Sequence, residues 1–404
     1  MTQDVLNNDI SADQASTIAG INDFILGYLG YDMRLVKILE VADQSEDCLA
    51  NTYAGLLWML SETGDVPSEA RRYHERAAQS VTSALPREKL LFSVLEASIA
   101  DDPEAIIRLT DRILAQWPRD LVTLKLRQYH DFIRGRFEDM LAVALRSEDA
   151  AGDVAALHGM LAFAYEQCHD LPAAERSART ALAMDPSEPW AQHALAHVFL
   201  TQGRIDEGTA FLEERSAGWK MLTSFMDTHL WWHLALFYLA RNRVSDAVSV
   251  YDQHCWTRER SFSQDQVGAV SLLVRLELAG ADVEDRWTDL ANWLTSRQDD
   301  VSQPFLTLQY LYGLLRAHRP EGQHLLRRIE GLSGQSLPDQ RAWDLVGIPL
   351  ARGLNAYLHN ENASALLSFN DALPHLQDIG GSHAQRDLFI QIHQDLKRRM
   401  PKRD

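Results

Sequence analysis

Two pairs of histidines are the residues whose type and spacing could do chemistry in this chain. His193 and His197 lie in the apolar stretch "WAQHALAHVFL", and His229 and His233 lie in "THLWWHLALFYL". Residues four apart fall on one face of a helix, one turn from each other. Each stretch therefore predicts two imidazole rings side by side on a helix surface.

Several kinds of chemistry suit such rings. His193, His197, His229 and His233 could together hold a divalent metal such as zinc, because two histidines one helical turn apart can chelate it. A catalytic metal would use three protein ligands, with Glu166 as a further candidate, plus water. Without a metal, these histidines could do acid–base work, with Glu166 orienting one ring. Side-chain packing alone is the remaining alternative.

Other residues near the histidine stretches are candidates for the same site. His158 begins the helical stretch that contains Glu166, and Trp232 lies beside His233, so both are expected to contact a ligand in a polar-aromatic pocket. In "IGGSHAQRD" (379–387) two glycines break a helix and Ser382 is suited to cap the next one. His383 would project from the first turn of that helix, with Arg386 nearby.

The elements that must position these residues are helices. Apolar residues recur at spacings of three and four, and turn signals such as "QGR" (202–204) and "RNR" (241–243) separate the helices at short intervals. Small residues at Ala162, Ala174 and Ala181, closed by Pro186, have the offsets of a tetratricopeptide repeat. A shift of about 34 residues, the length of this repeat, gives Ala196 and Gly208. The first helix of each pair would line a concave surface.

These patterns predict one all-α domain over residues 1–404, a right-handed α-solenoid of tetratricopeptide-like helix-turn-helix repeats curved around a central groove or pocket. The clearest repeats span 155–260 and 345–390. Residues 80–150 and 260–345 are predicted to be helical but degenerate, and 1–20 form a polar N-terminal segment. Stacked first helices lie roughly 8–10 Å apart, which would let Glu166 and the two histidine pairs converge.

Composition limits the partners of this chain. Its net charge is -18, with 57 acidic against 39 basic residues, whereas binding to nucleic acid or to anionic membrane needs a cationic surface. We expect neither. Three widely spaced cysteines, a polar N-terminus and the lack of a long apolar segment favour a cytoplasmic protein. A homo-oligomer is compatible with the sequence.

The chain resembles the tetratricopeptide repeat protein 38 family. The resemblance lies in "HGMLAFAYEQ" (158–167), "WAQHALAHVFLTQGRIDEG" (190–208), "HLWWHLALFYL" (229–239) and "GGSHAQRD" (380–387). It implies a single all-α solenoid of divergent repeats, and no particular activity. Family motif positions fall on the residues already named and on one more, His158, Glu166, His193, His197, His229, His233, His383, Gln385 and Arg386. Gln385 and Arg386 thereby become candidate ligand-binding residues.

The chain departs from that family at a few positions. The family has a second acidic residue where this chain has Gln167, and an Asn where it has Leu230. It tends to carry an Asp and a His near Thr307 and Gln309. The resemblance therefore gives less support to an enzymatic role than to the fold.

Two functions follow from these expectations. The first is a binding protein that captures a small molecule or peptide in a groove rich in His and Trp. The second is an enzyme that uses Glu166 and the groove histidines, with His383 from the C-terminal repeat, for acid–base or metal-assisted chemistry such as hydrolysis. The groove positions carry His, Glu and Trp, which suits a small molecule or metal better than a peptide terminus.

Overall fold

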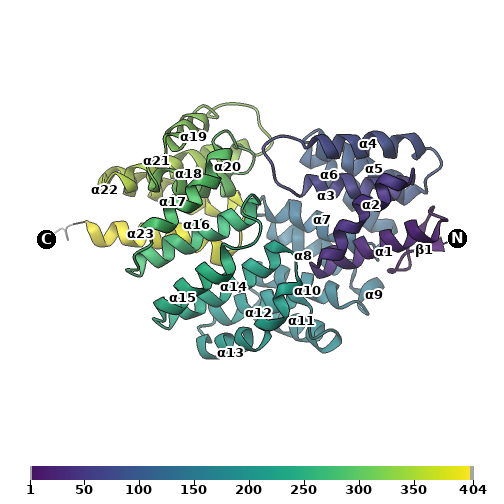
Figure 1. The fold of residues 1–404 in the computed structure, drawn as a ribbon, viewed down its shortest axis with the longest axis horizontal. Helices are drawn as coiled ribbons and strands as arrows, with labels where there is room; N and C mark the ends of the chain where they lie inside the picture. The colour runs from purple at the N-terminus through teal and green to yellow at the C-terminus, as the bar shows by residue number, and fades with distance from the viewer. Residues whose placement is uncertain (1, 401–404) are drawn as a thin grey trace. The chain divides into compact units, whose positions relative to one another are not determined.

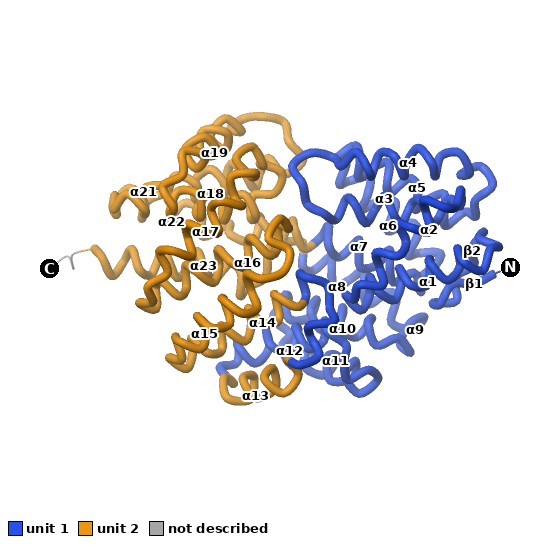
Figure 2. The backbone as a smooth tube through the Cα atoms, in the orientation of Figure 1, with its two compact units in different colours: residues 1–131, 137–203, 217–226 blue, residues 132–136, 204–216, 227–404 orange. Residues whose placement is uncertain are grey.

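The computed structural model of the chain describes residues 2–400, and residues 1 and 401–404 of the predicted domain lie outside the described part. The described chain is all-α apart from one two-stranded hairpin, which confirms the predicted fold class (Figure 1). Its contacts group into two compact units (Figure 2): unit 1 comprises residues 1–131, 137–203 and 217–226, and unit 2 comprises 132–136, 204–216 and 227–404. Each unit is described by itself.

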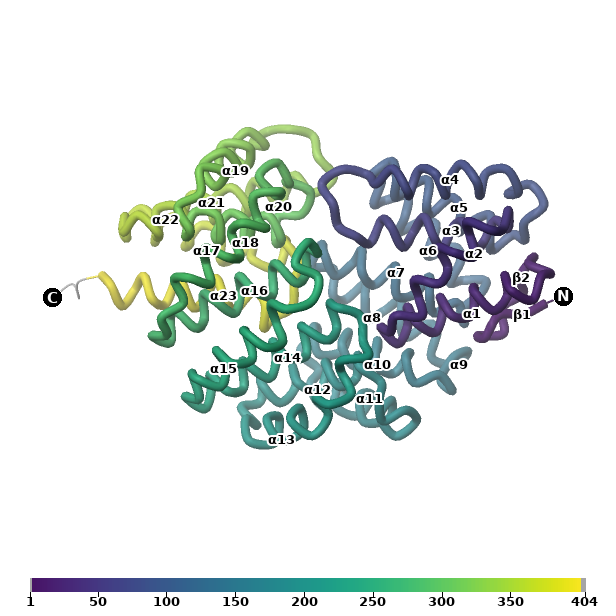
Figure 3. Tube along the Cα trace, in the orientation of Figure 1, coloured from purple at the N-terminus to yellow at the C-terminus, as the bar shows by residue number. Residues whose placement is uncertain are grey.

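The helices follow one another in antiparallel pairs through both units, as Figure 3 traces from purple to yellow. The elements up to residue 201 are β1 Thr2–Gln3, β2 Asp9–Ile10, α1 Ala15–Gly30, η1 Met33–Val36, α2 Lys37–Gln44, α3 Cys48–Met59, α4 Ser68–Ser80, α5 Pro86–Ile99, α6 Pro103–Gln116, α7 Leu121–Phe132, α8 Phe137–Leu145, α9 Glu148–Ala151, α10 Ala155–Gln167, α11 Leu171–Met184 and α12 Pro189–Thr201. The elements after it are α13 Ile205–Arg215, η2 Ser216–Met221, α14 Ser224–Ala240, α15 Val244–Val250, η3 Tyr251–Cys255, α16 Ser263–Leu278, α17 Glu284–Leu294, η4 Thr295–Arg297, α18 Pro304–Arg316, α19 Pro320–Glu330, α20 Gln340–Ala342, η5 Trp343–Gly347, α21 Ile348–Leu358, α22 Asn362–Ala372, η6 Leu373–Ile379 and α23 His383–Arg399.

A recurring turn gives the chain its repeat. In six helix pairs the first helix ends two residues before a residue with left-handed backbone, and these residues recur every 34 to 42 positions along the chain. They are His169, Gly203, Asn242, Gly280, His318 and Asn360, with φ between 53° and 87°. A left-handed residue closes a helix C-terminus because it turns the chain back onto the last carbonyls. The turns predicted at "QGR" and "RNR" are thus confirmed.

Small residues bring the paired helices together, as the sequence predicts. Ala162 on α10 and Ala174 and Ala181 on α11 are all fully buried, and α10 packs against α11. In unit 2 a Cβ atom at Gly353 would come within 2.9 Å of the Phe369 ring, which explains why α21 carries glycine where it meets α22. Close packing of helices needs this loss of side-chain volume at the contact.

The polar N-terminal segment is part of the core of unit 1. Residues 2–10 form the hairpin of β1 and β2. Within it, the buried Asp4 forms an ion pair with Arg87 at 3.3 Å. Arg87, only 1% exposed, also pairs with Asp120 at 2.8 Å. Removing one partner of such a buried set leaves an uncompensated charge. These ion pairs join residues that are far apart in sequence.

Candidate functional site

Helix α12 places His193 and His197 next to each other in unit 1. Glu188 caps its start by accepting the backbone N–H of Ala191, Pro189 is its first residue, and Gly203 follows its end. Both rings are 1% exposed. Their centroids lie 4.6 Å apart with an interplanar angle of 83°. The predicted pair on one helical face is therefore present.

A buried carboxylate extends this pair into a chain of three titratable groups. Oε2 of Glu166, on α10, lies 3.6 Å from Nδ1 of His197, and Nε2 of His197 lies 3.0 Å from Nε2 of His193. Glu166 is fully buried. We call Glu166, His197 and His193 the Glu166 relay. It confirms the expected position of Glu166 beside one of the α12 histidines.

The order of contacts in the relay suits one arrangement of the ring protons. A carboxylate favours a proton on the nitrogen that faces it, so neutral His197 is protonated at Nδ1. Nε2 of His197 then accepts a hydrogen bond, and Nε2 of His193 must be its donor. In that arrangement of ring protons the lone pair of His193 lies on Nδ1.

Gln167 supports the relay at the position where the resembled family has an acid. Its side-chain amide donates a hydrogen bond to Oε2 of Glu166, the same oxygen that faces His197. An ionised acid at this position could not donate that bond and would repel Glu166. The departure from the family pattern therefore changes the electrostatics of the carboxylate without removing it.

Aromatic rings cover the relay. Trp190 stacks on His193 with centroids 4.4 Å apart, and Phe163 packs against both His193 and His197 at 5.0 and 5.6 Å. Tyr31, just after α1, stacks in turn on Trp190 at 5.3 Å. Trp190 is only partly buried. The stack therefore runs from the buried relay to a ring that meets solvent.

A buried lysine, Lys125, lies at the other end of this stack, and the sequence did not reveal it. Nζ of Lys125, on α7, lies 3.3 Å from the centre of the Tyr31 ring and donates to the carbonyls of Tyr28 and Leu29. Burial lowers the pKa of Lys125 well below its usual value and raises the pKa of Glu188 to about 8. No local pattern links Lys125 to Tyr31, which is 94 positions away, so only the fold brings them together.

Helix α14 carries the other histidine pair in unit 2, in different surroundings. His229 and His233 have ring centroids 4.8 Å apart, and Trp232 stacks on His229 at 5.3 Å. The three side chains are 8%, 0% and 1% exposed, in the order His229, His233, Trp232. Burial lowers the pKa of His229 to about 3. This pair is thus held among aromatic rings in a strongly desolvated environment.

Arg275 contacts both Trp232 and the C-terminal motif within unit 2. The guanidinium of Arg275, on α16, lies 5.3 Å from the Trp232 ring and donates to the carbonyl of Ala384 at 2.7 Å. Burial lowers its pKa to about 10. Trp232 on α14 and the first turn of α23 therefore contact one buried cation, which the sequence did not single out.

The C-terminal motif folds as its sequence predicts. Gly380 and Gly381 adopt φ of 72° and 78°, and Ser382 caps α23 by accepting the N–H of Gln385. Arg386 donates to the carbonyl of Gly381 and lies 3.1 Å from Nδ1 of His383. The side chain of Gln385 completes the capping box by accepting the N–H of Ser382. The ligand-binding roles predicted for His383, Gln385 and Arg386 stay predictions.

Three other sequence candidates have local contacts of their own. Nε2 of His158 lies 2.8 Å from the carbonyl of Gly152, at the start of α10. Thr307 donates to the carbonyl of Asp300, and Gln309 donates to that of Phe305, both on or beside α18. The ligand-binding role predicted for His158 stays a prediction. The four-histidine metal site takes two ligands from each unit and stays a prediction.

Two further findings complete the description. No helix in residues 2–400 combines the length and the apolar character that crossing a bilayer requires. No protein-family model matches the chain.

Proposed function

We propose that the protein binds a small polar molecule next to His193 in unit 1 and exchanges a proton with it through the Glu166 relay. The observation that carries the proposal is the line of contacts from Glu166 to His197 to His193, at 3.6 and 3.0 Å, inside a buried aromatic shell. Helix packing alone has no need of a buried carboxylate beside two imidazoles, since burying ionisable groups costs free energy.

Trp190 supports this proposal because its ring contacts His193 on one side and meets solvent, from which a ligand would enter. It stacks on His193 and is partly exposed, so a ligand that displaces or slides past its ring would reach Nδ1 of His193. A ligand held there would find an aromatic surface on one side and a base on the other. Sites for small molecules commonly combine an apolar wall with a few polar atoms that fix orientation.

A metal-assisted enzyme is the second candidate, and the same distances favour it. Two nitrogens that bind zinc tetrahedrally at 2.0–2.1 Å lie about 3.3 Å apart, and the two Nε2 atoms of His193 and His197 lie 3.0 Å apart. Glu166 behind His197 matches the carboxylate–histidine arrangement that orients metal ligands. Bound zinc would lower the pKa of a water for hydrolysis. A proton and a metal cannot both lie between the rings.

Metal analysis separates the two candidates. The purified full chain and the His193→Gln/His197→Gln variant are compared after dialysis against zinc, with His324→Gln, which alters an exposed histidine paired with Asp299, as the control. One zinc per chain that is lost in the first variant supports the metal-assisted enzyme. Lack of zinc together with a proton uptake that disappears in the first variant supports the relay. Thermal unfolding of each variant shows that the loss is not caused by misfolding.

The repeat class and location belong to the same proposal. Small residues at tetratricopeptide offsets and the recurring left-handed turn support tetratricopeptide-like repeats, of the kind found in the tetratricopeptide repeat protein 38 family. All three cysteines are free, and Cys48 and Cys255 are buried. Free thiols suit a reducing compartment such as the cytoplasm.

A further inference from the structure

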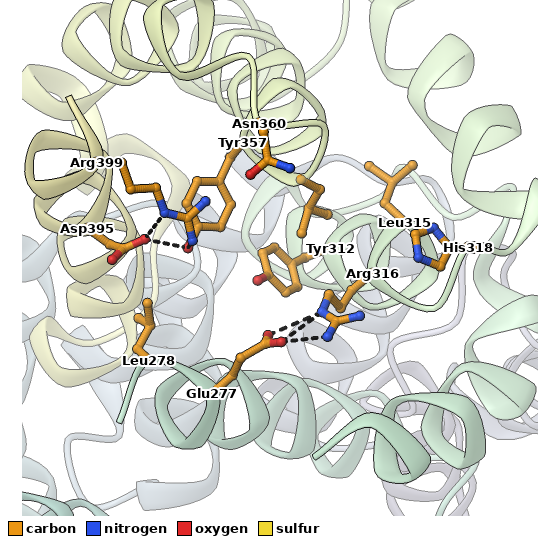
Figure 4. Close-up of a pocket in the computed structure, with 11 residues that line it drawn as sticks. Glu277, Leu278, Tyr312, Leu315, Arg316, His318, Tyr357, Asn360, Asp395 and Arg399 are labelled. Carbon is orange, nitrogen blue, oxygen red and sulfur yellow. Dashed lines mark hydrogen bonds and ion pairs between the residues drawn. The ribbon is translucent and has the colours of Figure 1, made fainter. Parts of the chain in front are cut away.

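Unit 2 contains a pocket that is separate from both histidine pairs. It has a volume of about 350 Å³ and lies where α16, α18 and α21 end, with the last turns of α23 closing one side (Figure 4). Its volume falls within the range of small-molecule sites. We propose that this pocket binds an uncharged, polyhydroxylated molecule such as a sugar or polyol.

Every formal charge on the wall of this pocket is neutralised by a neighbour. Arg316 donates two hydrogen bonds to Oε1 of Glu277, at 2.6 and 2.9 Å, and forms a second ion pair with Glu284 at 2.7 Å. Arg399 pairs with Asp395 at 2.7 Å. A charged ligand would have to compete with these contacts. Anions are disfavoured further because helix C-termini carry partial negative charge.

Paired charges still offer hydrogen bonds to a neutral ligand. A guanidinium has five N–H donors and a carboxylate has about four acceptor positions, so one ion pair leaves donors and acceptors unused. These groups lie on opposite sides of the pocket, with Arg316 and Glu277 on one side and Arg399 and Asp395 on the other (Figure 4). Neighbouring hydroxyl groups, each both donor and acceptor, complement such a wall.

The hydroxyl of Tyr312 is a polar group of this pocket that can bond a ligand. Its side chain is 3% exposed, and its hydroxyl has no hydrogen-bond partner within residues 2–400. Figure 4 shows Tyr312 between the two ion pairs. Tyr357, by contrast, accepts from Arg399 and donates to Asp395, both at 2.9 Å. A ligand hydroxyl would bond this hydroxyl in place of solvent water, with a modest net gain in free energy.

The rest of the wall suits the carbon skeleton of such a ligand. Leu278, Leu315 and Leu358 line the pocket beside the two tyrosines. A sugar or polyol presents C–H groups between its hydroxyls, and these can contact leucine side chains and aromatic faces. A metal ion would find no such match, because the carboxylates here are already bound by guanidinium groups.

Ligand-observed NMR on the full chain tests the proposal. The neutral probes are glucose and myo-inositol, and the charged probes are acetate and butylammonium, each at millimolar concentration. We expect saturation transfer to the neutral probes only. Tyr312→Phe should weaken their binding about three- to tenfold, the effect of one hydrogen bond. Tyr238→Phe, which removes a unit 2 hydroxyl bonded to Glu213 outside the pocket, should leave binding unchanged.

Other outcomes overturn the proposal. Lack of binding by both neutral probes at tens of millimolar, binding by a charged probe alone, or an equal loss in Tyr238→Phe would each contradict it. The His193→Gln/His197→Gln variant should bind the neutral probes like the unaltered chain. The pocket can therefore be tested whether or not the function proposed for the Glu166 relay holds.

Discussion

The two histidine pairs have the same spacing but different neighbours within their own units. His193 and His197 contact a buried carboxylate, whereas His229 and His233 are covered by Trp232, with burial driving the pKa of His229 to about 3. A partner charge favours the protonated ring, and desolvation disfavours it. Spacing on a helix therefore sets only the geometry of the two rings. Their neighbours decide whether they exchange protons near neutral pH.

The largest expected effect contrasts the two tryptophans. Trp232 is 1% exposed and Trp190 is partly exposed. We expect Trp232→Ala to lower the free energy of unfolding by about 3–5 kcal/mol, as for other buried aromatic residues. Trp190→Ala should cost less than half of that, because its ring already meets solvent. Urea unfolding monitored by circular dichroism measures both, and equal losses would contradict a ligand-facing role for Trp190.

The next effect is the pH dependence contributed by His229. Its pKa is about 3 in the folded state and 6.5 when unfolded, so the unfolded chain binds the proton first as pH falls. The difference in pKa has little effect on the free energy of unfolding above pH 6.5. Below pH 6.5 it lowers that free energy progressively as the pH falls. Between pH 7.5 and 5 this amounts to about 2 kcal/mol. Unfolding free energies of the unaltered chain and His229→Gln should converge by that amount on acidification, and parallel pH profiles would contradict it.

A smaller effect tests the carboxylate of the relay. Glu166→Gln keeps the shape but removes the charge next to His197, so the first proton should bind less readily. We expect the two rings to take up a proton only at lower pH than in the unaltered chain, because the neighbouring negative charge is gone. Titration followed by NMR of the two rings measures it. Glu175→Gln, which breaks a surface pair with Arg179, is the control and should cause no shift.

The smallest effect concerns His158. Its ring bonds the carbonyl of Gly152, so His158→Ala should cost about 1 kcal/mol of unfolding free energy. The titration of the relay should not change, because this contact is with the backbone. A shifted titration of His193 or His197 in His158→Ala would instead place His158 in the site.

Local patterns were enough to predict most of the fold and part of the site. The alanines at 162, 174 and 181, the turn at Gly203 and the Ser382 cap are set by contacts between residues close in sequence, so the sequence pattern predicts them. Glu166 was found because, in the preceding repeat, it falls on the helix face expected to line the groove with the histidines. These features need only helical periodicity and a repeat length.

Other parts depend on long-range packing and have no local signal. Lys125 meets Tyr31 and Arg275 meets Ala384 across 94 and 109 positions, and neither cation lies in a motif. Likewise, the difference between the two histidine pairs depends on which side chains bury them. The unit 2 pocket forms where residues from four helices meet. Such arrangements follow from the fold as a whole.

The protonation of the two α12 histidines tests the central claim most directly. Long-range ¹H–¹⁵N correlation spectra of the full chain at neutral pH distinguish a protonated Nδ1 from a protonated Nε2 in each ring. The Glu166 relay predicts His197 protonated at Nδ1 and His193 protonated at Nε2, with His193 changing its Nδ1 signal first on acidification. His193 protonated at Nδ1 in the neutral state, or unaltered ring protonation in Glu166→Gln, would contradict the account.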